Sequence, residues 1–388
     1  MSRFLFVVPP LVGHVNPTVG VASCLAGLGH QVAWAGAAEA LTPLIGADRT
    51  IYDCAIGVRE VHRPPELRGP AALKFLWESF LVPLAEAMVP GVHAAVERFA
   101  PDVLVVDQQA LAGALVADRL GLPWVTSATT SAELVDPLAG VPKVAAWLAE
   151  LLGGLRARFG DPALDGDPRF SRSLILAFSS RALVGPTTTG PVAFVGPSIV
   201  ERPSDLDVDW PSGDPDHPAV LVSLGTANAD AGEKFLTACA QALAKRPVRA
   251  VVVDPAGVLG PQPPHVRLRP RVPQLRLLAG ADAVLCHGGH NTVCESLWHG
   301  VPLVIAPIRD DQPIIAGQVV EAGAGLRLRF NRASAEVIGA AIDTVLAEPS
   351  YRDSARRVRD SFTAAGGAPR AARLLTELAA KAEERKSA

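Results

Sequence analysis

Short, almost continuous apolar runs recur along this chain and alternate with stretches of helical periodicity. Runs such as FLFVV at 4–8 and VLVVD at 103–107 lack the polar alternation of a strand with one face in water. Strands that are apolar on both faces are typical of parallel sheets covered by helices on both sides. The pattern therefore predicts an α/β fold with parallel, doubly wound sheets.

The apolar runs form two series, separated by a segment rich in proline and aspartate at 196–219. Such a segment is typical of a linker. We expect two Rossmann-like domains facing a central cleft, where ligands bind beyond the carboxyl ends of the strands. The predicted divisions are an N-terminal domain at 1–198, a linker at 199–218, a C-terminal domain at 219–350, and helices at 351–388 that pack back on the N-terminal domain. The predicted strands are 4–8, 31–35, 103–107, 124–127, 174–178 and 192–195, then 220–223, 249–253, 266–268, 283–286, 303–306 and 325–328.

Charge and composition argue against several classes of partner. A net charge of −3 and only two tyrosines favour neither a nucleic-acid surface nor a base-stacking platform. We found no run of about 18 uncharged apolar residues, so we expect no membrane span. Prolines interrupt the N-terminal apolar run too early for a secretory signal, so we expect a cytoplasmic protein. We also expect a monomer or a homodimer.

The five cysteines lie far apart, at 24, 54, 239, 286 and 294. An odd, scattered set without a CxxC pair favours a reducing compartment over a disulfide framework. It also argues against a structural zinc site, so we expect no metal.

The segment CHGGHNTVCES at 286–296 joins an expected strand to an expected helix. Its two glycines, Gly288 and Gly289, would let the backbone approach a ligand closely. A helix that begins near Asn291 and Thr292 would point free N–H groups at this joint, which is a site for an anion such as a diphosphate. The alternative is that Asn291 only caps the helix and the glycines only make a turn.

Polar residues also follow other strands of the second series. Thr226 ends the first of these strands, Asp311 and Gln312 follow another, and Glu295 lies one turn along the helix after Asn291. Because parallel strands end at one edge of the sheet, these groups are expected to converge on one ligand.

At these residues the chain resembles the inverting GT-B glycosyltransferases of plant secondary products and bacterial natural products. The likeness rests on RVPQ, HGGHNTVCES, HGVPLVIAP and DDQ between Arg271 and Gln312, and on GHVNP and VVD in the first half. It implies a UDP- or TDP-sugar co-substrate, no other cofactor, and a small apolar aglycone as acceptor. Two positions depart from the plant-type signature, where tryptophan stands in place of Arg271 and of His290.

The resemblance also implies roles for individual residues. His287 would contact the diphosphate, with Asn291 and Thr292 beside it, and Glu295 would hold the ribose. Gln274 and the Val272 backbone would contact the base and ribose, with Arg271 at the stacking position. Asp311 and Gln312 would bind the donor sugar, and Thr226 would touch phosphate.

His14 follows the first strand, and we expect it in a loop before a helix at 17–28 that Asn16 caps and Pro17 opens. Asp107 ends another buried strand, and an Asp there can orient the imidazole of a nearby His. The resemblance places the general base on His14 and its partner on Asp107. The alternatives are that His14 has no role and that Asp107 caps the next helix.

We expect less regular segments of the first half, at 62–89 and 131–170, to hold the acceptor. Among their apolar residues Phe75, Trp77, Phe80 and Trp147 are candidates, although helix-spaced apolar residues are more often core.

Other classes of protein are weighed against a transferase. A dinucleotide oxidoreductase would need GxGxxG after the first strand, where this chain has PPLVGHVNP. A nucleotide-sugar epimerase and a non-enzymatic two-lobed binding protein share the expected layout and stay as alternatives.

Overall fold

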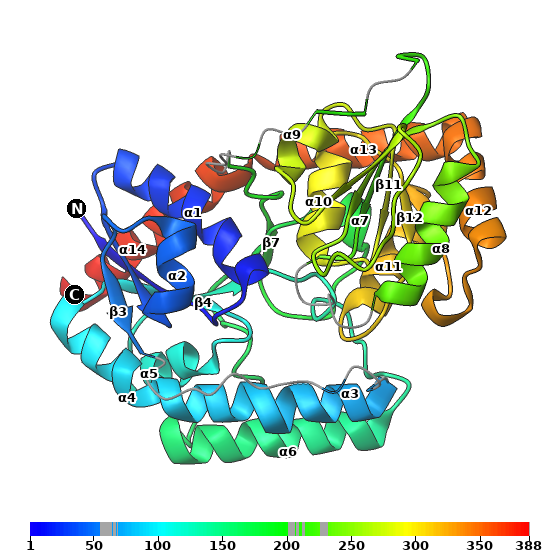
Figure 1. Ribbon diagram of the computed structural model, residues 1–388. Helices are drawn as coiled ribbons and strands as arrows, with labels where there is room; N and C mark the ends of the chain where they lie inside the picture. Colours follow the sequence, from blue (N-terminus) through cyan, green and yellow to red (C-terminus); the bar gives the residue numbers. More distant parts are fainter. Residues whose placement is uncertain are drawn as a thin grey trace.

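The computed structural model contains two parallel sheets, one in each half of the chain (Figure 1). It describes residues 1–54, 64, 67, 69–200, 206, 209–211, 214–225 and 232–387, with side chains through 384. The seven-stranded sheet has the order β3-β2-β1-β4-β5-β6-β7. Its strands are β1 (Arg3–Val7), β2 (Gln31–Gly36), β3 (Ile51–Asp53), β4 (Val103–Asp107), β5 (Trp124–Ala128), β6 (Ile175–Ala177) and β7 (Val192–Phe194).

The six-stranded sheet has the order β10-β9-β8-β11-β12-β13. All strand pairs in both sheets are parallel, which confirms the predicted fold class. In each sheet the chain starts at a central strand and winds outward both ways, so the carboxyl ends of the central strands lie at a topological switch point. The strands are β8 (Ala219–Ser223), β9 (Arg249–Val253), β10 (Val266–Arg269), β11 (Ala283–Cys286), β12 (Leu303–Ile305) and β13 (Gly325–Arg327).

Helices cover both faces of each sheet. In the first half they are α1 (Val12–Gly27), α2 (Ala38–Ile45), α3 (Gly69–Phe75), the π-helical turn η1 (Leu76–Leu81), α4 (Val82–Phe99), α5 (Leu111–Leu120), α6 (Pro142–Phe159) and α7 (Arg181–Val184). In the second half they are α8 (Glu233–Ala244), α9 (Gln274–Leu278), α10 (His290–Trp298), α11 (Gln312–Glu321), the 3-10 turn η3 (Phe330–Arg332), α12 (Ala335–Ala347), α13 (Pro349–Ala365) and α14 (Gly367–Ser387).

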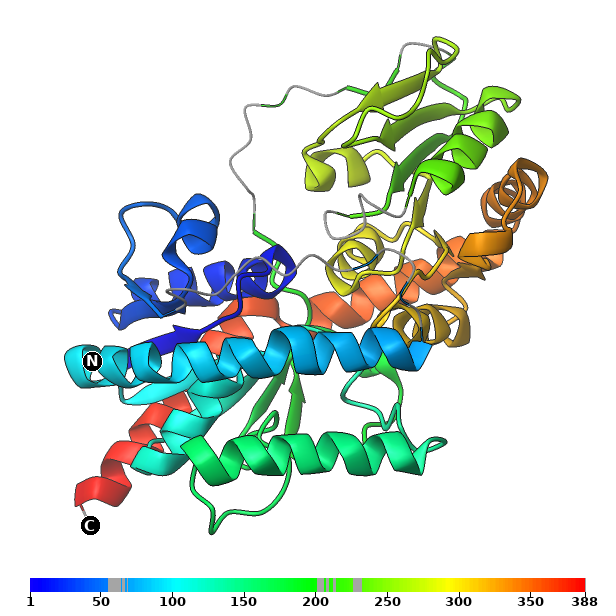
Figure 2. The ribbon, with the colours of Figure 1, turned by 60° about the horizontal axis from the view of Figure 1, so that its bottom comes forward.

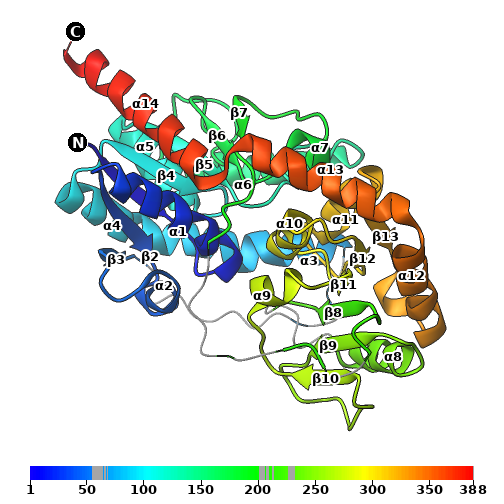
Figure 3. The same ribbon diagram turned by 90° about the horizontal axis from the view of Figure 1, so that it is seen from above.

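The last two helices belong to different cores. Val358 and Phe362 of α13 are buried with the second sheet, whereas Ala371 and Leu375 of α14 are buried beside α1 on the first. The chain changes direction at Gly366, whose φ of 92° suits glycine. Figure 3 shows α13 and α14 running along one side of the molecule from one half to the other. The predicted domain limits stay predictions.

Two long helical rods lie side by side in the first half (Figure 2). One is the run 69–99, formed by α3, η1 and α4, and the other is α6, which packs on it through Trp77, Leu81 and Leu152. The rods correct the expectation of less regular chain at 131–170, because Pro142 opens an 18-residue helix there.

The run 69–99 also bears on the membrane prediction. By length and composition alone it is apolar enough to cross a bilayer, a feature that a buried core helix shares. It contains no uncharged run of 18 residues because Glu86 divides the apolar stretch between Glu78 and Glu97. In the structure its residues Leu84, Met88 and Val92 are buried against the first sheet.

Candidate active site

His14 and Asp107 meet at the carboxyl ends of two neighbouring strands. Strands β1 and β4 pair in parallel, with Val7 beside Val106, so the segments that follow them start side by side. His14 Nδ1 lies 2.9 Å from Asp107 Oδ1 and 3.0 Å from Oδ2. The Asp107 side chain is fully buried, and 15% of the His14 side chain is exposed. Residues 93 positions apart thus form the pair that the sequence predicted.

Two further groups hold the Asp107 carboxylate, and sequence reasoning found neither. The Thr129 hydroxyl donates to Asp107 Oδ2 at 2.6 Å and lies 2.8 Å from His14 Nδ1. The backbone N–H of Gln109 donates to Asp107 Oδ1 at 2.8 Å. With these donors the carboxylate is held in place and orients the imidazole with Nδ1 toward it, so that Nε2 is the nitrogen able to accept a proton. Asp107 does not cap the next helix, whose N-cap residue is Ala110.

The surroundings of His14 tune its basicity. Burial by itself would lower the pKa of the imidazole, but the charge and hydrogen bond of Asp107 oppose this, helped by the charges of Asp311 and Glu133. The net result is a His14 pKa raised above its ordinary value. The imidazole is therefore a stronger base than a free histidine.

The helix that carries His14 begins earlier than predicted. Helix α1 starts at Val12, so His14 lies in its first turn and Asn16 caps nothing. Pro17 lies inside the helix rather than at its start. The prediction was wrong because proline usually opens a helix. Here Pro17 provides no N–H to the backbone oxygen of Gly13, and the side chain of Asn291 donates to that oxygen instead.

The corner between β11 and α10 packs around the His287 ring. A side chain at Gly289 would collide with His287 Nε2, and one at Gly225 would come within 2.7 Å of its Cε1. Gly288 has a φ of 88°, which favours glycine. The glycines were predicted to let the backbone approach a ligand, and in the structure the group they let come close is the His287 ring.

His287 is a neutral donor or acceptor at pH 7. Burial and, to a lesser degree, the charge of Arg309 together lower its pKa to about 4, against the opposing effect of a hydrogen bond to the Ser223 backbone. Its Nδ1 is buried without a hydrogen-bond partner among the described residues. The nearby cation, Arg309, is itself buried and follows β12 in the sequence PIRDDQ, a position that sequence reasoning passed over.

The first backbone N–H groups of helix α10 have no partner among the residues that the structure describes. Its N-cap is Gly289, with no side-chain cap, so the first N–H groups are open to an anion. Asn291 does not cap the helix, because its Nδ2 donates instead to the backbone oxygen of Gly13, 2.9 Å away. Thr292 is buried, and its backbone oxygen accepts the Ser296 hydroxyl.

The predicted base and ribose residues lie together in part. Gln274 Nε2 donates to Glu295 Oε2 at 2.6 Å, so the two predicted ribose contacts are neighbours. Val272 packs on the core of the second half, whereas Arg271 is exposed. Thr226 lies outside the described residues.

The two residues predicted to bind the donor sugar have different partners, one in the first half of the chain and one in their own loop. Asp311 accepts a hydrogen bond from the Thr130 hydroxyl at 2.7 Å. Burial raises the pKa of Asp311, and the Thr130 bond opposes that rise. Gln312 turns its Oε1 back to the N–H groups of Ile308 (2.9 Å) and Arg309 (3.1 Å), which orders the loop after β12.

The segment after β5 joins the two halves through consecutive residues. Thr130 bonds to Asp311, and the next residue, Ser131, donates to Gln318 Oε1 at 2.6 Å and lies 3.3 Å from His290 Nδ1. His290, which stands where the plant-type signature has tryptophan, also reaches the Phe178 oxygen at 3.3 Å. Burial lowers its pKa to about 4, so it links the halves as a neutral ring.

The four acceptor candidates are not equivalent. Trp77 is only 2% exposed and packs in the core between the two rods, so its assignment to the pocket wall is corrected. Phe75 and Phe80 are half-buried in the same rod, and Trp147 donates to Glu78 Oε1 at 3.2 Å. All four residues show the spacing of apolar residues on a helix, so the sequence does not distinguish a core position from a pocket position. The packing in the structure makes that distinction.

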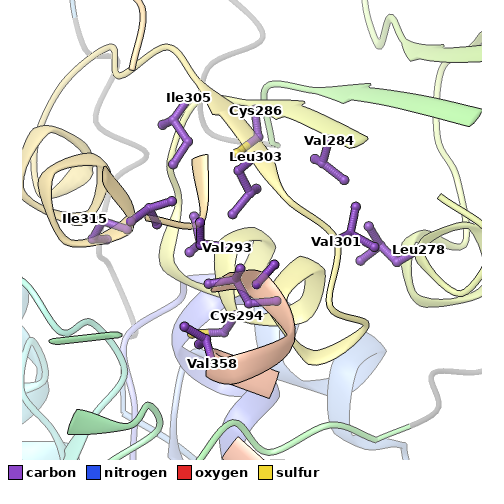
Figure 4. Close-up of a cluster of buried hydrophobic side chains, with 14 of the residues drawn as sticks. Leu278, Val284, Cys286, Val293, Cys294, Val301, Leu303, Ile305, Ile315 and Val358 are labelled. Atoms are coloured by element: carbon purple, nitrogen blue, oxygen red, sulfur yellow. The ribbon is translucent and has the colours of Figure 1, made fainter. Parts of the chain in front are cut away.

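Cys286 and Cys294 are core residues, not ligands (Figure 4). Burial raises the pKa of Cys286 to about 12 and raises that of Cys294 as well. Among the described residues, no cluster of His, Cys, Asp and Glu has the makings of a metal site.

Known proteins share this arrangement over nearly the whole chain. Residues 235–378 match the family described as erythromycin biosynthesis protein CIII-like, C-terminal domain. The 4'-demethylrebeccamycin synthase of Lentzea aerocolonigenes is 30% identical, with 94% of this chain and 96% of that protein covered. The NDP-glycosyltransferase YjiC of Bacillus subtilis (strain 168) is 27% identical, with 94% of each covered.

Solved structures agree with these relatives. The glycotransferase of kitacinnamycin has a TM-score of 0.78 at 26% identity, covering 97% of this chain and 98% of that one. The spinosyn rhamnosyltransferase SpnG complexed with thymidine diphosphate has a TM-score of 0.76 at 26% identity, covering 96% and 100%. The chain therefore belongs to the GT-B family of natural-product NDP-sugar glycosyltransferases.

Proposed function

We propose that this glycosyltransferase moves a sugar from a nucleoside diphosphate to a hydroxyl of an apolar natural-product aglycone, with inversion at the anomeric carbon. The observation that carries the proposal is the hydrogen-bonded pair of His14 and Asp107, which stands across the interface from the free N-terminus of α10. One group can deprotonate a nucleophile and the other can hold a departing diphosphate.

The proposed reaction is one displacement. Nε2 of His14 takes the proton of the acceptor hydroxyl while the acceptor oxygen bonds to the anomeric carbon, and the bond from that carbon to the diphosphate oxygen breaks on the opposite face. Asp107, paired with His14 Nδ1 at 2.9 Å, stabilises the imidazolium that forms. The negative charge that develops on the diphosphate is met by the N–H groups of α10, by His287 and by the nearby charge of Arg309.

Residues of the second half of the chain are proposed to recognise the donor. Glu295 and Gln274, already bonded to each other, would take the ribose hydroxyls, and Asp311 would take sugar hydroxyls next to Thr130. The solved SpnG structure holds thymidine diphosphate, and YjiC is named for NDP donors in general. Both UDP- and TDP-sugars are therefore the donors to test.

Transfer by the wild-type enzyme is the direct test. With UDP-glucose or TDP-glucose and a panel of phenols, indoles and macrolactones that includes 4-methylumbelliferone, we expect a product heavier by one sugar in mass spectrometry. The anomeric proton coupling of the product should report a β-linkage from the α-linked donor. Change of the donor's configuration without an acceptor product would favour an epimerase, and binding without turnover would favour a non-enzymatic binding protein.

Gly289→Ala is expected to weaken nucleoside diphosphate binding by about tenfold, roughly the value of one hydrogen bond to a charged group. The backbone at Gly289 (φ −63°, ψ 135°) suits any residue, but the added methyl group collides with the His287 ring. Calorimetric titration with UDP and TDP measures the effect. The control is Gly154→Ala in α6, where nothing lies within 4 Å of the added atom; equal affinities in both variants would remove His287 from the diphosphate site.

A further inference from the structure

The backbone oxygen of Gly13 lacks its usual partner inside α1. In an α-helix the N–H of each residue donates to the backbone oxygen four positions earlier, so the donor expected for the Gly13 oxygen is residue 17. That residue is Pro17, which lies inside the helix and has no N–H. The amide of Asn291, 278 positions away, donates to this oxygen at 2.9 Å.

We propose that Pro17 and Asn291 act together to fix the first turn of α1, and with it His14, against the N-terminus of α10. Pro17 frees the acceptor, and Asn291 supplies the donor. Asn291 is then a positioning residue that sets the distance between the base and the diphosphate site. The inference rests on the proposed function, in which His14 is the base and α10 holds the diphosphate.

The location of the bond supports this role. Gly13 directly precedes His14, and Asn291 is the second residue of α10, so one hydrogen bond joins the two segments that the reaction must align. A misplacement of about 1 Å between reacting groups can cost about 10²-fold in rate. The bond to Gly13 uses one of the two N–H donors of the Asn291 amide, and the nucleotide affinity of a variant measures whether the other serves a phosphate.

Packing alone does not fix the interface at this point. Asn16 and Pro17 of α1 line a small pocket together with Asn291, Cys294 and Glu295 of α10. Where side chains leave such a space, a directional hydrogen bond helps to set the separation of the two helices.

Three variants test the proposal: Asn291→Ala, Pro17→Ala and the double variant. Asn291→Ala is expected to lower kcat about tenfold, the value of one well-placed hydrogen bond to an orienting group, while the Kd for UDP and TDP changes less than about threefold. Pro17→Ala restores an N–H that can serve Gly13, and it leaves Asn291 in place, so most of the activity should remain. Asn331→Ala, an exposed asparagine in η3, is the matched control.

Thermal unfolding distinguishes the contribution of the Gly13 hydrogen bond to protein stability from its contribution to the alignment of the two helices. Asn291→Ala alone leaves that oxygen without a donor, and we expect Tm to fall by about 3 °C. In the Pro17→Ala background the same change should cost less, because the N–H of residue 17 then bonds to Gly13. The kcat should stay low in the double variant, because it lacks the bond between Asn291 and Gly13.

Two results would overturn the inference. A tenfold loss of UDP and TDP affinity in Asn291→Ala, with kcat kept at saturating donor, would make Asn291 a phosphate ligand. An equal fall in Tm in both backgrounds would show that Pro17 and Asn291 do not share the Gly13 oxygen. Failure of the proposed function would appear elsewhere, as an absence of transfer by the wild type or as turnover that survives the loss of His14.

Discussion

Replacing His14 with alanine is expected to lower kcat by about 10²- to 10⁴-fold, the usual value of general-base assistance. The variant loses the only group in the proposed reaction that can take the acceptor proton. The donor site is expected to survive, because α10, His287 and the Glu295–Gln274 pair all belong to the second half of the chain. Calorimetry should therefore give Kd values for UDP and TDP within about twofold of wild type.

The control for this variant is another histidine outside the interface. His93 lies on α4, 3.5 Å from Glu97, with 41% of its side chain exposed, so His93→Ala should leave turnover unchanged. Near wild-type kcat in His14→Ala would show that another group removes the proton, and the base assignment would fall. A large loss of UDP and TDP binding in the same variant would instead make His14 part of the donor site.

Asp107→Asn is expected to lower kcat by a similar factor, about 10²-fold or more, although His14 is still present. The amide keeps the shape of Asp107 but carries no charge to stabilise the imidazolium. Its NH₂ group can also face His14 Nδ1, which favours the tautomer with the proton on Nε2 and blocks the base.

The pH profile gives this variant a signature that a folding defect would not produce. His14 acts as a base only when neutral, so kcat rises with pH through its pKa, which Asp107 holds above the ordinary value. Without the charge of Asp107, burial lowers the pKa of His14, and the acidic limb of the profile should move to lower pH while the plateau falls. An unchanged limb would mean that the titrating group is not His14. Thr129→Ala removes one donor to Asp107 and should shift the limb less.

The local pattern predicted most elements well where both ends carried a signal. Strand β4 was predicted at its observed bounds, 103–107, because its apolar run begins after Pro101 and ends at a charged residue. Helix α12, at 335–347, carries a comparable signal at its start, where Ser334 is the N-cap and its hydroxyl oxygen accepts from the Val337 N–H. The short strand β3 was missed, since three half-exposed or exposed residues carry almost no periodicity.

The residues of the candidate site that could be predicted are mainly those at the ends of strands. Asp107 ends a strand, His287 follows one and His14 lies in the first turn of a helix, and parallel sheets bring such positions to one edge. Thr129 follows a strand as well, but nothing in its neighbourhood distinguishes it from any buried threonine. It becomes part of the site only because β5 lies next to β4 and places its hydroxyl 2.6 Å from Asp107.

The sequence by itself determined two parallel sheets, the polar residues at their edges, and the family to which the chain belongs, because each follows from local periodicity or from a contiguous motif. The tertiary structure alone decided which donor serves which acceptor across the two halves. Asn291 looks like a helix cap in the sequence and bonds to Gly13 in the fold. The reason is physical: a hydrogen bond depends on separation in space within about 3 Å, and periodicity along the chain carries no information about residues that meet only after both halves have folded.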